Sequence, residues 1–220
     1  MFRPEQFFDL SAFEYADLFA DLEYVWEALT RLEAYVLVHT PTGQSIRGTV
    51  HPGAFLVGEH ILIEEGAVVE PGAYIEGPSL IGRGCVVRHG AYVRSNTLAG
   101  AGSLIGHATE TKNTLLLPES KAAHFAYIGD SILGNRVNLG AGTKLANYRL
   151  GGGLIKLRVD GSTAISTGRN KLGAILGDDC QLGCNSVCNP GTLLGPRSSV
   201  RPLAVVSGYH PARTQVKPTV

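Results

Sequence analysis

Aliphatic side chains recur at every sixth position through the first half of this sequence. Nine of the eleven positions in the series are Val, Ile or Leu: Val57, Ile63, Val69, Ile75, Ile81, Val87, Val93, Ala99, Ile105, Thr111 and Leu117. An amphipathic helix repeats at about 3.6 residues and a half-buried strand simply alternates, so neither explains a period of six. A hexapeptide repeat is typical of a β-helix, in which short parallel strands turn corners and stack into a solenoid.

The period also predicts which residues lie above one another. If three hexads make one coil, residues 18 positions apart are vertical neighbours, about 4.8 Å apart. Many of the 28 glycines fall in phase with the repeat, as corners with positive φ require. The pattern therefore predicts an all-β fold, a single-stranded parallel β-helix of about seven or eight coils over residues 46–208.

The repeat is interrupted twice. Its phase breaks after Ala123, and we expect a loop to leave the coil there. A second interruption, at about 149–171, reads as an inserted β-hairpin with Asp160-Gly161 at its turn. The repeat resumes at aliphatic or small positions on both sides of this insertion: Leu133, Leu139, Leu145, Leu176, Leu182, Cys188, Leu194, Val200 and Val206. Residues 209–220 have lost the pattern and are expected to form an extended or mobile tail.

Residues 1–45 differ from the rest and are predicted to form a short helical cap. Ser11-Ala-Phe-Glu14 fits a capping box. One helical face follows, made of Leu22, Val25, Trp26, Leu29 and Leu32. We expect two short helices packed on the solenoid or on a partner subunit, and favour an end cap that covers the open strand edges of the first coil.

Composition excludes several classes of protein. The chain has 19 basic and 19 acidic residues, which argues against a nucleic-acid-binding track. It has no apolar run of membrane-spanning length, and its acidic N-terminus is unlike a secretory signal. Four cysteines make no disulfide framework in a chain of this size. We expect a cytoplasmic protein with no membrane partner.

Two basic residues suggest an anion site. Arg94 and Lys112 are 18 positions apart, one full coil, so the two cations should stack. A bound anion such as a sugar phosphate would explain their juxtaposition. The alternative is that both side chains splay into solvent.

His124 lies at the first phase break, close to Tyr127. It could be a general base near neutral pH or a structural hydrogen-bonding group. A metal site is not predicted: His89 and His107 should stack, but no pair at short strand spacing and no supporting carboxylate accompanies them. Cys180, Cys184 and Cys188 are spaced by four and are expected to be small buried hydrophobic residues.

The polar segment around His124 resembles a known family. The matching residues are Arg94, Glu110-Thr-Lys112, Ser120-Lys-Ala-Ala-His124-Phe-Ala-Tyr127-Ile-Gly-Asp130, Asn138-Leu-Gly-Ala141-Gly-Thr143 and Asn147-Tyr148, continued by Lys171 and Gly177-Asp-Asp179. They resemble the left-handed β-helix acetyltransferase domain of the bifunctional N-acetylglucosamine-1-phosphate uridyltransferase / glucosamine-1-phosphate acetyltransferase family of hexapeptide-repeat transferases. The match is specific over 94–148, looser over 171–206 and absent over 1–45.

The resemblance implies a left-handed solenoid, a homotrimer with sites between subunits, and acetyl-CoA as co-substrate without a metal. It implies His124 as the general base. It assigns the sugar phosphate to Arg94, Lys112, Tyr127, Asn138, Asn147, Tyr148 and Lys171. It assigns the coenzyme to Ala141, Cys184 and Pro202.

Three departures from the family stand out. Cys184 and Pro202 stand where the family tends to have small residues. The insertion puts 22 residues between Tyr148 and Lys171. The family's nucleotidyltransferase domain has no counterpart in this sequence, so a separate nucleotidyltransferase is expected to act next in the pathway. The leading hypothesis is a stand-alone acetyltransferase acting on an amino-sugar 1-phosphate such as glucosamine 1-phosphate. The alternatives are a non-catalytic sugar-phosphate-binding or regulatory subunit, and a related acyltransferase with a different amine or acyl donor.

Overall fold

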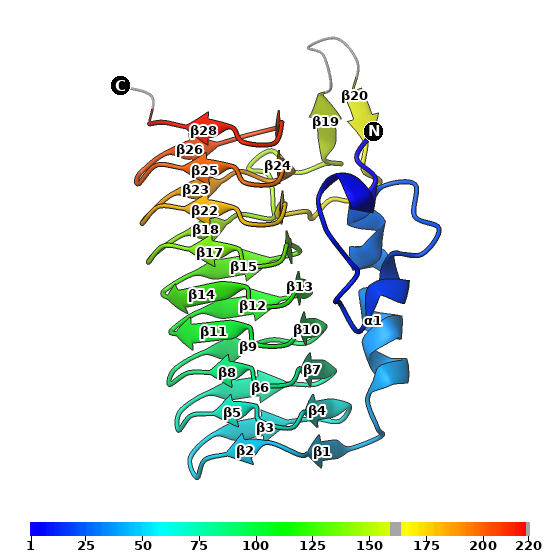
Figure 1. The fold of residues 1–220 in the computed structure, drawn as a ribbon, viewed down its shortest axis with the longest axis vertical. Coiled ribbons are helices and arrows are strands. Elements are labelled where there is room, and N and C mark those ends of the chain that lie inside the picture. The colour runs from blue at the N-terminus through cyan, green and yellow to red at the C-terminus, as the bar shows by residue number, and fades with distance from the viewer. Residues whose placement is uncertain (159–163, 219–220) are drawn as a thin grey trace.

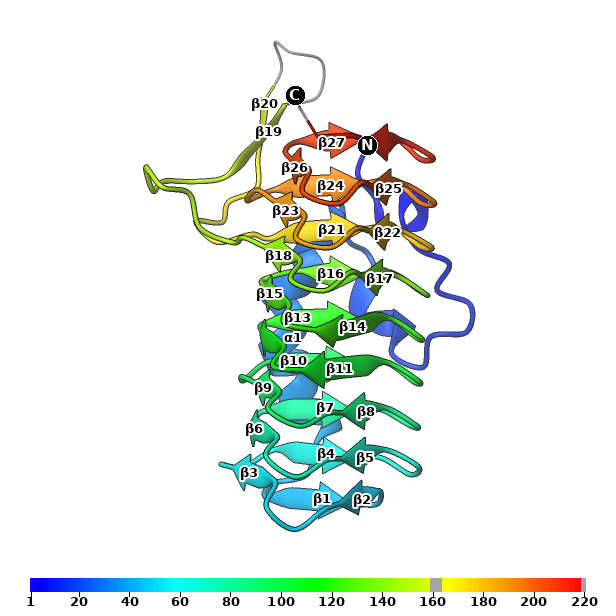
Figure 2. The same cartoon turned by 90° about the vertical axis from the view of Figure 1, so that its left-hand side faces the viewer.

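The chain forms a β-helix with three parallel sheets along its sides (Figures 1 and 2). The structure, a computed structural model, describes residues 1–158 and 164–218. Successive strands of one sheet belong to successive coils, because each strand pairs with the strand three places further along the solenoid. The predicted fold class, a parallel β-helix of the left-handed hexapeptide type, is confirmed.

The three sheets have nine, nine and eight strands. Sheet A comprises β1 (Gln44–Ile46), β4 (Ile61–Ile63), β7 (Ser79–Ile81), β10 (Thr97–Ala99), β13 (Thr114–Leu116), β16 (Ile132–Leu133), β21 (Ala174–Leu176), β24 (Thr192–Leu194) and β27 (Tyr209–His210). Sheet B comprises β2 (Thr49–Val50), β5 (Val68–Val69), β8 (Val86–Val87), β11 (Leu104–His107), β14 (Lys121–His124), β17 (Asn138–Leu139), β22 (Gln181–Leu182), β25 (Ser199–Val200) and β28 (Gln215–Val216). Sheet C comprises β3 (Phe55–Val57), β6 (Tyr74–Glu76), β9 (Tyr92–Val93), β12 (Glu110–Lys112), β15 (Tyr127–Gly129), β18 (Lys144–Leu145), β23 (Val187–Cys188) and β26 (Val205–Val206).

The solenoid is longer than predicted and its period is less strict. Sheets A and B have nine strands, so about nine coils form rather than seven or eight. Most hexad residues line the interior as expected, but the phase slips by one residue at both ends of the first series. Leu56 packs against the core while Val57 is exposed, and Leu116 replaces Leu117 in the interior cluster.

The phase break expected after Ala123 lies instead at the corners before Thr114 and before Ile132, and it has a simple cause. Register pairs such as Tyr92 and Glu110 lie 18 residues apart, whereas Glu110 and Tyr127 lie 17 apart. The corner that leads from sheet C to sheet A loses one residue in two successive coils. No long loop leaves the coil there, so that expectation is wrong.

The N-terminal segment does not close the end of the solenoid but runs along its side (Figure 1). It contains three 3₁₀ helices, η1 (Pro4–Gln6), η2 (Ala16–Phe19) and η3 (Val25–Glu27), followed by α1 (Ala28–His39). Helix α1 packs on β7, β10 and β13 of sheet A. The end-cap interpretation is therefore wrong, and so is the capping box, because the helix after Ser11 begins only at Ala16.

The outer face of sheet A explains this placement. Its middle residues form an apolar ladder in register from coil to coil: Leu62, Leu80, Leu98, Leu115, Ile132, Ile175 and Leu193. All of them are buried in one cluster with the N-terminal aromatic residues. Because sheet A is apolar on both faces, it requires a cover, and the N-terminal segment supplies it.

Two other predicted segments can be compared with the structure. The insertion contains an antiparallel pair, β19 (Lys156–Arg158) and β20 (Ala164–Ser166), as predicted, while its Asp160-Gly161 turn lies outside the described residues. The C-terminal tail prediction is wrong, because β27 and β28 pair with β24 and β25 and continue the solenoid.

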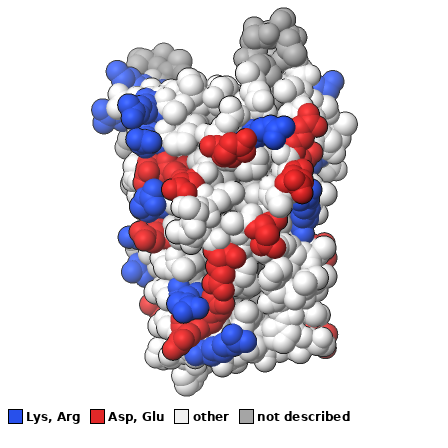
Figure 3. All heavy atoms as spheres, turned by 45° about the vertical axis from the view of Figure 1, so that its right-hand side comes forward, with Lys and Arg blue, Asp and Glu red and all other residues white. Residues whose placement is uncertain are grey.

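On the face that carries the N-terminal segment, acidic and basic side chains are interspersed (Figure 3). Among the described residues, no helix is both long and apolar enough to cross a membrane.

Candidate active site

The two predicted anion ligands lie on the outer face of sheet C. Val93 and Thr111 point into the core, so the alternation of the strand directs Arg94 and Lys112 outward on neighbouring coils. Arg94 donates from Nη1 to Glu110 Oε1 over 3.0 Å, and this hydrogen bond raises the pKa of Arg94. The expected repulsion between the two cations is thus offset by a carboxylate, so their juxtaposition does not by itself demand a bound anion.

Tyr127 and Asn147 meet beside Gly129 on the same face. Tyr127 Oη donates to Asn147 Oδ1 over 3.4 Å. A Cβ atom at Gly129 would lie 2.6 Å from Asn147 Nδ2 and 2.7 Å from Tyr127 Oη, so only glycine leaves room for this pair. Burial, reinforced by the negative charges of Glu110 and Asp130, raises the pKa of Tyr127. The phenol therefore stays protonated near neutral pH and remains a hydrogen-bond donor.

A buried carboxylate that was not predicted as a site residue supports this pair. Asp130 is 4% exposed and lies at the shortened corner between sheets C and A, with φ of 45°. Asn113 and Asn147 occupy the same corner one coil before and one coil after it. Each donates from Nδ2 to Asp130, over 2.9 Å and 2.7 Å. The spacing of 17 residues between positions 113, 130 and 147 is the sequence signal that could have identified this corner ladder.

The predicted base and coenzyme residues share the opposite corner, between sheets B and C. We call His124, Ala141, Cys184 and Pro202 the donor column, because the register of β14, β17, β22 and β25 stacks them on four successive coils. Backbone hydrogen bonds fix this stack: Gly142 N donates to the His124 carbonyl, Asn185 N to the Ala141 carbonyl and Leu203 N to the Cys184 carbonyl.

The ring of His124 differs from those of its neighbours along this corner. His89 and His107 stack with ring centroids 5.6 Å apart, as predicted, and their Nδ1 atoms contact the carbonyls of Pro71 and His89 at 2.7 and 2.8 Å. Within the described part of the chain, His124 is exposed and its ring nitrogens contact no hydrogen-bonding group. The described residues also contain no group of three or more His, Cys, Asp or Glu arranged to hold a metal.

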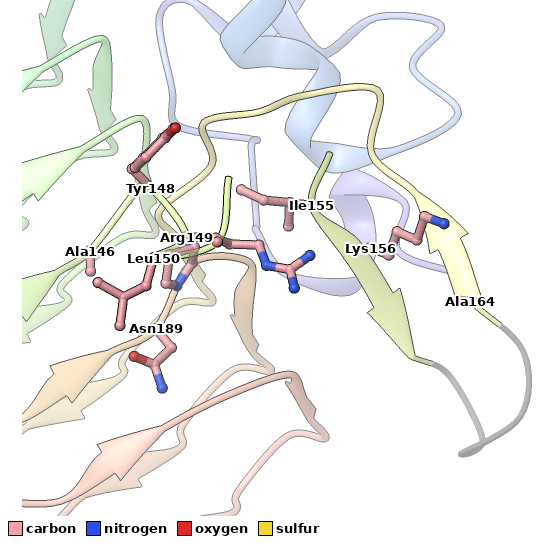
Figure 4. A pocket seen from close by; sticks show the side chains of 10 residues that line it. Ala146, Tyr148, Arg149, Leu150, Ile155, Lys156, Ala164 and Asn189 are labelled. Atoms are coloured by element: carbon pink, nitrogen blue, oxygen red, sulfur yellow. The ribbon is translucent and has the colours of Figure 1, made fainter. Parts of the chain in front are cut away.

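The side chains of three predicted sugar ligands make no hydrogen bond with the Tyr127–Asn147 pair among the described residues. Asn138 belongs to sheet B and lines a shallow hollow there with Gln181 and Pro202. Lys171 reaches the corner through its backbone, as the antiparallel bridge partner of Tyr148, while its side chain is exposed. Tyr148 itself lines a cavity of about 820 Å³ between the coils and the insertion, together with Arg149 and Lys156 (Figure 4).

The cysteines divide into two kinds. Cys85, Cys180 and Cys188 are buried, and burial raises the pKa of each thiol to about 12. Cys184 is exposed, so its expected burial is wrong. Its place in the donor column keeps it a candidate coenzyme contact.

Part of the chain matches a known protein family. Residues 60–95 match the family described as "Bacterial transferase hexapeptide (six repeats)". Together with the three-sheeted coil, this match confirms the resemblance to hexapeptide-repeat transferases seen in the sequence.

Two of its relatives are named as bifunctional proteins. The chain is 33% identical over 194 residues to "Bifunctional sugar-1-phosphate nucleotidylyltransferase/acetyltransferase" from Sulfurisphaera tokodaii, covering 88% of this chain and 47% of the relative. It is 36% identical over 180 residues to "Bifunctional protein GlmU" from Methanococcus maripaludis, covering 82% of this chain and 42% of the relative. The chain thus spans less than half the length of these two relatives.

A solved structure with a similar coil is UDP-N-acetylglucosamine acyltransferase from Campylobacter jejuni, at 17% identity and a TM-score of 0.40. The match covers 74% of this chain and 69% of that one.

Proposed function

We propose that this protein transfers an acetyl group from acetyl-CoA to the amine of an amino-sugar 1-phosphate such as glucosamine 1-phosphate. The observation that carries the proposal is the arrangement of two sets of groups along sheet C. An acceptor set of Lys112, Tyr127 and Asn147 lies on sheet C and at its corner with sheet A, and the donor column lies at the other end of sheet C, at its corner with sheet B. His124, the first residue of the donor column, precedes Tyr127 by three positions and is a base without a partner among the described residues.

The acceptor set suits a phosphorylated sugar. Lys112 supplies a cation for the phosphate, and Arg94 beside it keeps further donor groups while bound to Glu110. The Tyr127 phenol and the Asn147 amide offer donors and an acceptor to sugar hydroxyl groups. These two neutral groups can orient the hydroxyl groups of a sugar through hydrogen bonds, while the cations bind its phosphate.

The donor column suits an extended thiol ester. From His124 to Pro202 it climbs three coils, about 14 Å at roughly 4.8 Å per strand spacing. Ala141 and Cys184, the middle members of the column, have short side chains, so an extended pantetheine arm can lie against the backbone there. The reactive thioester would then lie at the His124 end, beside the sugar amine.

The chemistry balances with these groups. The amine nitrogen attacks the thioester carbonyl, a new C–N bond forms and the C–S bond breaks. His124 accepts the proton that the amine loses, and the thiolate of coenzyme A takes a proton as it leaves. Backbone N–H groups are the expected donors to the tetrahedral oxyanion.

A second copy of the chain completes the proposed site. Asn138 faces outward from sheet B, whereas Tyr127 faces outward from sheet C, so a single chain does not bring them together. Sheet A is covered by its own N-terminal segment, which leaves sheets B and C as the faces for neighbours. A homotrimer that joins sheet B of one subunit to sheet C of the next would supply Asn138. Sedimentation should therefore give three times the 23.3 kDa chain mass.

A thiol-release assay tests the function. Purified protein and acetyl-CoA are incubated with a panel of amino-sugar 1-phosphates, the matching unphosphorylated sugars and N-acetylated products. We expect thiol release only with free-amine 1-phosphates. Absence of thiol release across the panel, despite calorimetric binding of glucosamine 1-phosphate, would favour the non-catalytic binding subunit instead.

A further inference from the structure

We infer that Asp130 is a positioning residue for the acceptor sugar, held in place by Arg169 of the inserted segment. The inference rests on the proposed function, and it extends the site to a carboxylate and a guanidinium that the family motif did not assign. Both residues lie behind the Tyr127–Asn147 pair rather than beside the sugar itself.

Asp130 is a buried carboxylate whose two oxygens accept hydrogen bonds from three side chains. Its side chain is only 6% exposed, and its Oδ1 accepts from Asn113 Nδ2 at 2.9 Å and from Arg169 Nη2 at 3.2 Å. Its Oδ2 accepts from Asn147 Nδ2 at 2.7 Å. A buried carboxylate costs several kcal/mol in desolvation unless it is paired and hydrogen-bonded, and here both oxygens are satisfied.

The short bond to Asn147 has a directional consequence. A carboxylate only accepts, so it selects the amide orientation in which Nδ2 faces Asp130. Oδ1 of Asn147 must then face Tyr127 and the open side of sheet C. Without the charge on Asp130, the amide could turn over, and the acceptor sugar would meet a donor where it requires an acceptor.

Arg169 connects the insertion to this carboxylate. Besides its bond to Asp130, it donates from Nη1 to Thr30 Oγ1 of α1 over 2.9 Å and from Nε to the Lys171 carbonyl over 3.0 Å. One guanidinium thus joins the N-terminal helix, the end of the insertion and the corner ladder. This arrangement gives a physical role to the 22 residues that separate Tyr148 from Lys171: they return a cation to the back of the acceptor site.

The chain offers a matched control in Asp178. This aspartate is also buried, at 7% exposure, and it also accepts from an asparagine side chain, Asn135 Nδ2, at 2.9 Å. It holds the N-terminal segment through Asp9 N at 2.8 Å and contacts none of the proposed site residues. Asp178→Asn therefore imposes the same chemical change on a purely structural carboxylate.

The experiment compares KM values in the thiol-release assay, with glucosamine 1-phosphate as the acceptor. Asp130→Asn should raise the acceptor KM at least tenfold and leave the acetyl-CoA KM within twofold. Arg169→Met should act in the same direction, and Arg169→Lys should recover part of the loss. Asp178→Asn should lower the melting temperature without separating the two KM values.

Two results would overturn the inference. One is an Asp130→Asn variant whose KM values change together, as in Asp178→Asn. The other, if Asp130→Asn does not fold, is an Arg169→Met variant with an unchanged acceptor KM. If the wild-type protein releases no thiol at all, the proposed function fails separately. Calorimetric binding of glucosamine 1-phosphate to the same variants then tests the positioning role, and equal affinities would refute it.

Discussion

Replacing His124 by alanine should abolish most turnover while leaving the fold intact. The side chain is exposed on a regular strand, and its ring nitrogens have no partner among the described residues. Loss of a general base usually lowers kcat by about 10²–10⁴. At about 1.36 kcal/mol per tenfold change, this corresponds to about 2.7–5.5 kcal/mol in the activation free energy.

The expected effect on stability is much smaller. Substitution of an exposed side chain changes the free energy of unfolding by about 0.5 kcal/mol or less. For a chain of this size that corresponds to about 1–2 °C in melting temperature. The two magnitudes differ enough to separate a catalytic role from a structural one in a single pair of measurements.

His107 provides the control, since it lies directly below His124 in the register of β11 and β14. Its Nδ1 contacts the His89 carbonyl at 2.8 Å, so a hydrogen bond to the solenoid backbone holds its ring, in contrast to the ring of His124. Steady-state thiol release and differential scanning calorimetry are measured for His124→Ala, His124→Asn and His107→Ala. Turnover of His124→Ala within a few-fold of wild type would refute the mechanism. An equal loss of turnover in His107→Ala would show that the substitutions disturb the structure of the corner and do not report on a general base.

Three further predictions follow from burial and charge. Leu98→Ala, beneath α1 on the outer face of sheet A, should lower the unfolding free energy by about 2–5 kcal/mol in calorimetry, whereas Val38→Ala on the exposed side of α1 should not. Equal effects would mean that the N-terminal segment does not cover sheet A. Iodoacetamide should label Cys184 alone at pH 8, because a thiol with a pKa of about 12 stays protonated and unreactive, and acetyl-CoA should slow that labelling in mass spectrometry. Arg94→Ala or Lys112→Ala should raise the KM of the sugar phosphate, at a cost of about 1.5–3 kcal/mol per charged hydrogen bond, far more than that of acetyl-CoA. Matching changes in both KM values would identify them as surface charges.

Local repetition made much of the fold predictable. In a solenoid each residue packs mainly on its counterparts one coil away, so a period in the sequence is also a spatial map. The stacking of His89 on His107 and the vertical order of Arg94 and Lys112 followed from that map. The one-residue shifts in phase could not be predicted from the sequence. Leu56 and Leu116 are as aliphatic as Val57 and Leu117, the neighbours that a strict period of six selects.

The sequence by itself determined the coil, the position of the insertion and the two rows of candidate site residues, since all of these repeat at or near the coil length. It also carried an unused signal: the strands of sheet A are apolar on both faces, which requires that something cover them. Which segment does so was decided only by tertiary packing, as the Phe2 ring against Tyr209 of the last coil shows.

The contacts of Arg169 were also decided only by the tertiary structure. Asp130 and Thr30 lie 39 and 139 residues from Arg169 in the chain, at separations that no repeat encodes. The C-terminal strands had lost the aliphatic period, and yet β27 and β28 pair with β24 and β25 of the preceding coil. Periodic contacts are fixed by sequence spacing, whereas contacts between a solenoid and its non-repetitive segments depend on shape and charge that only the assembled fold brings together.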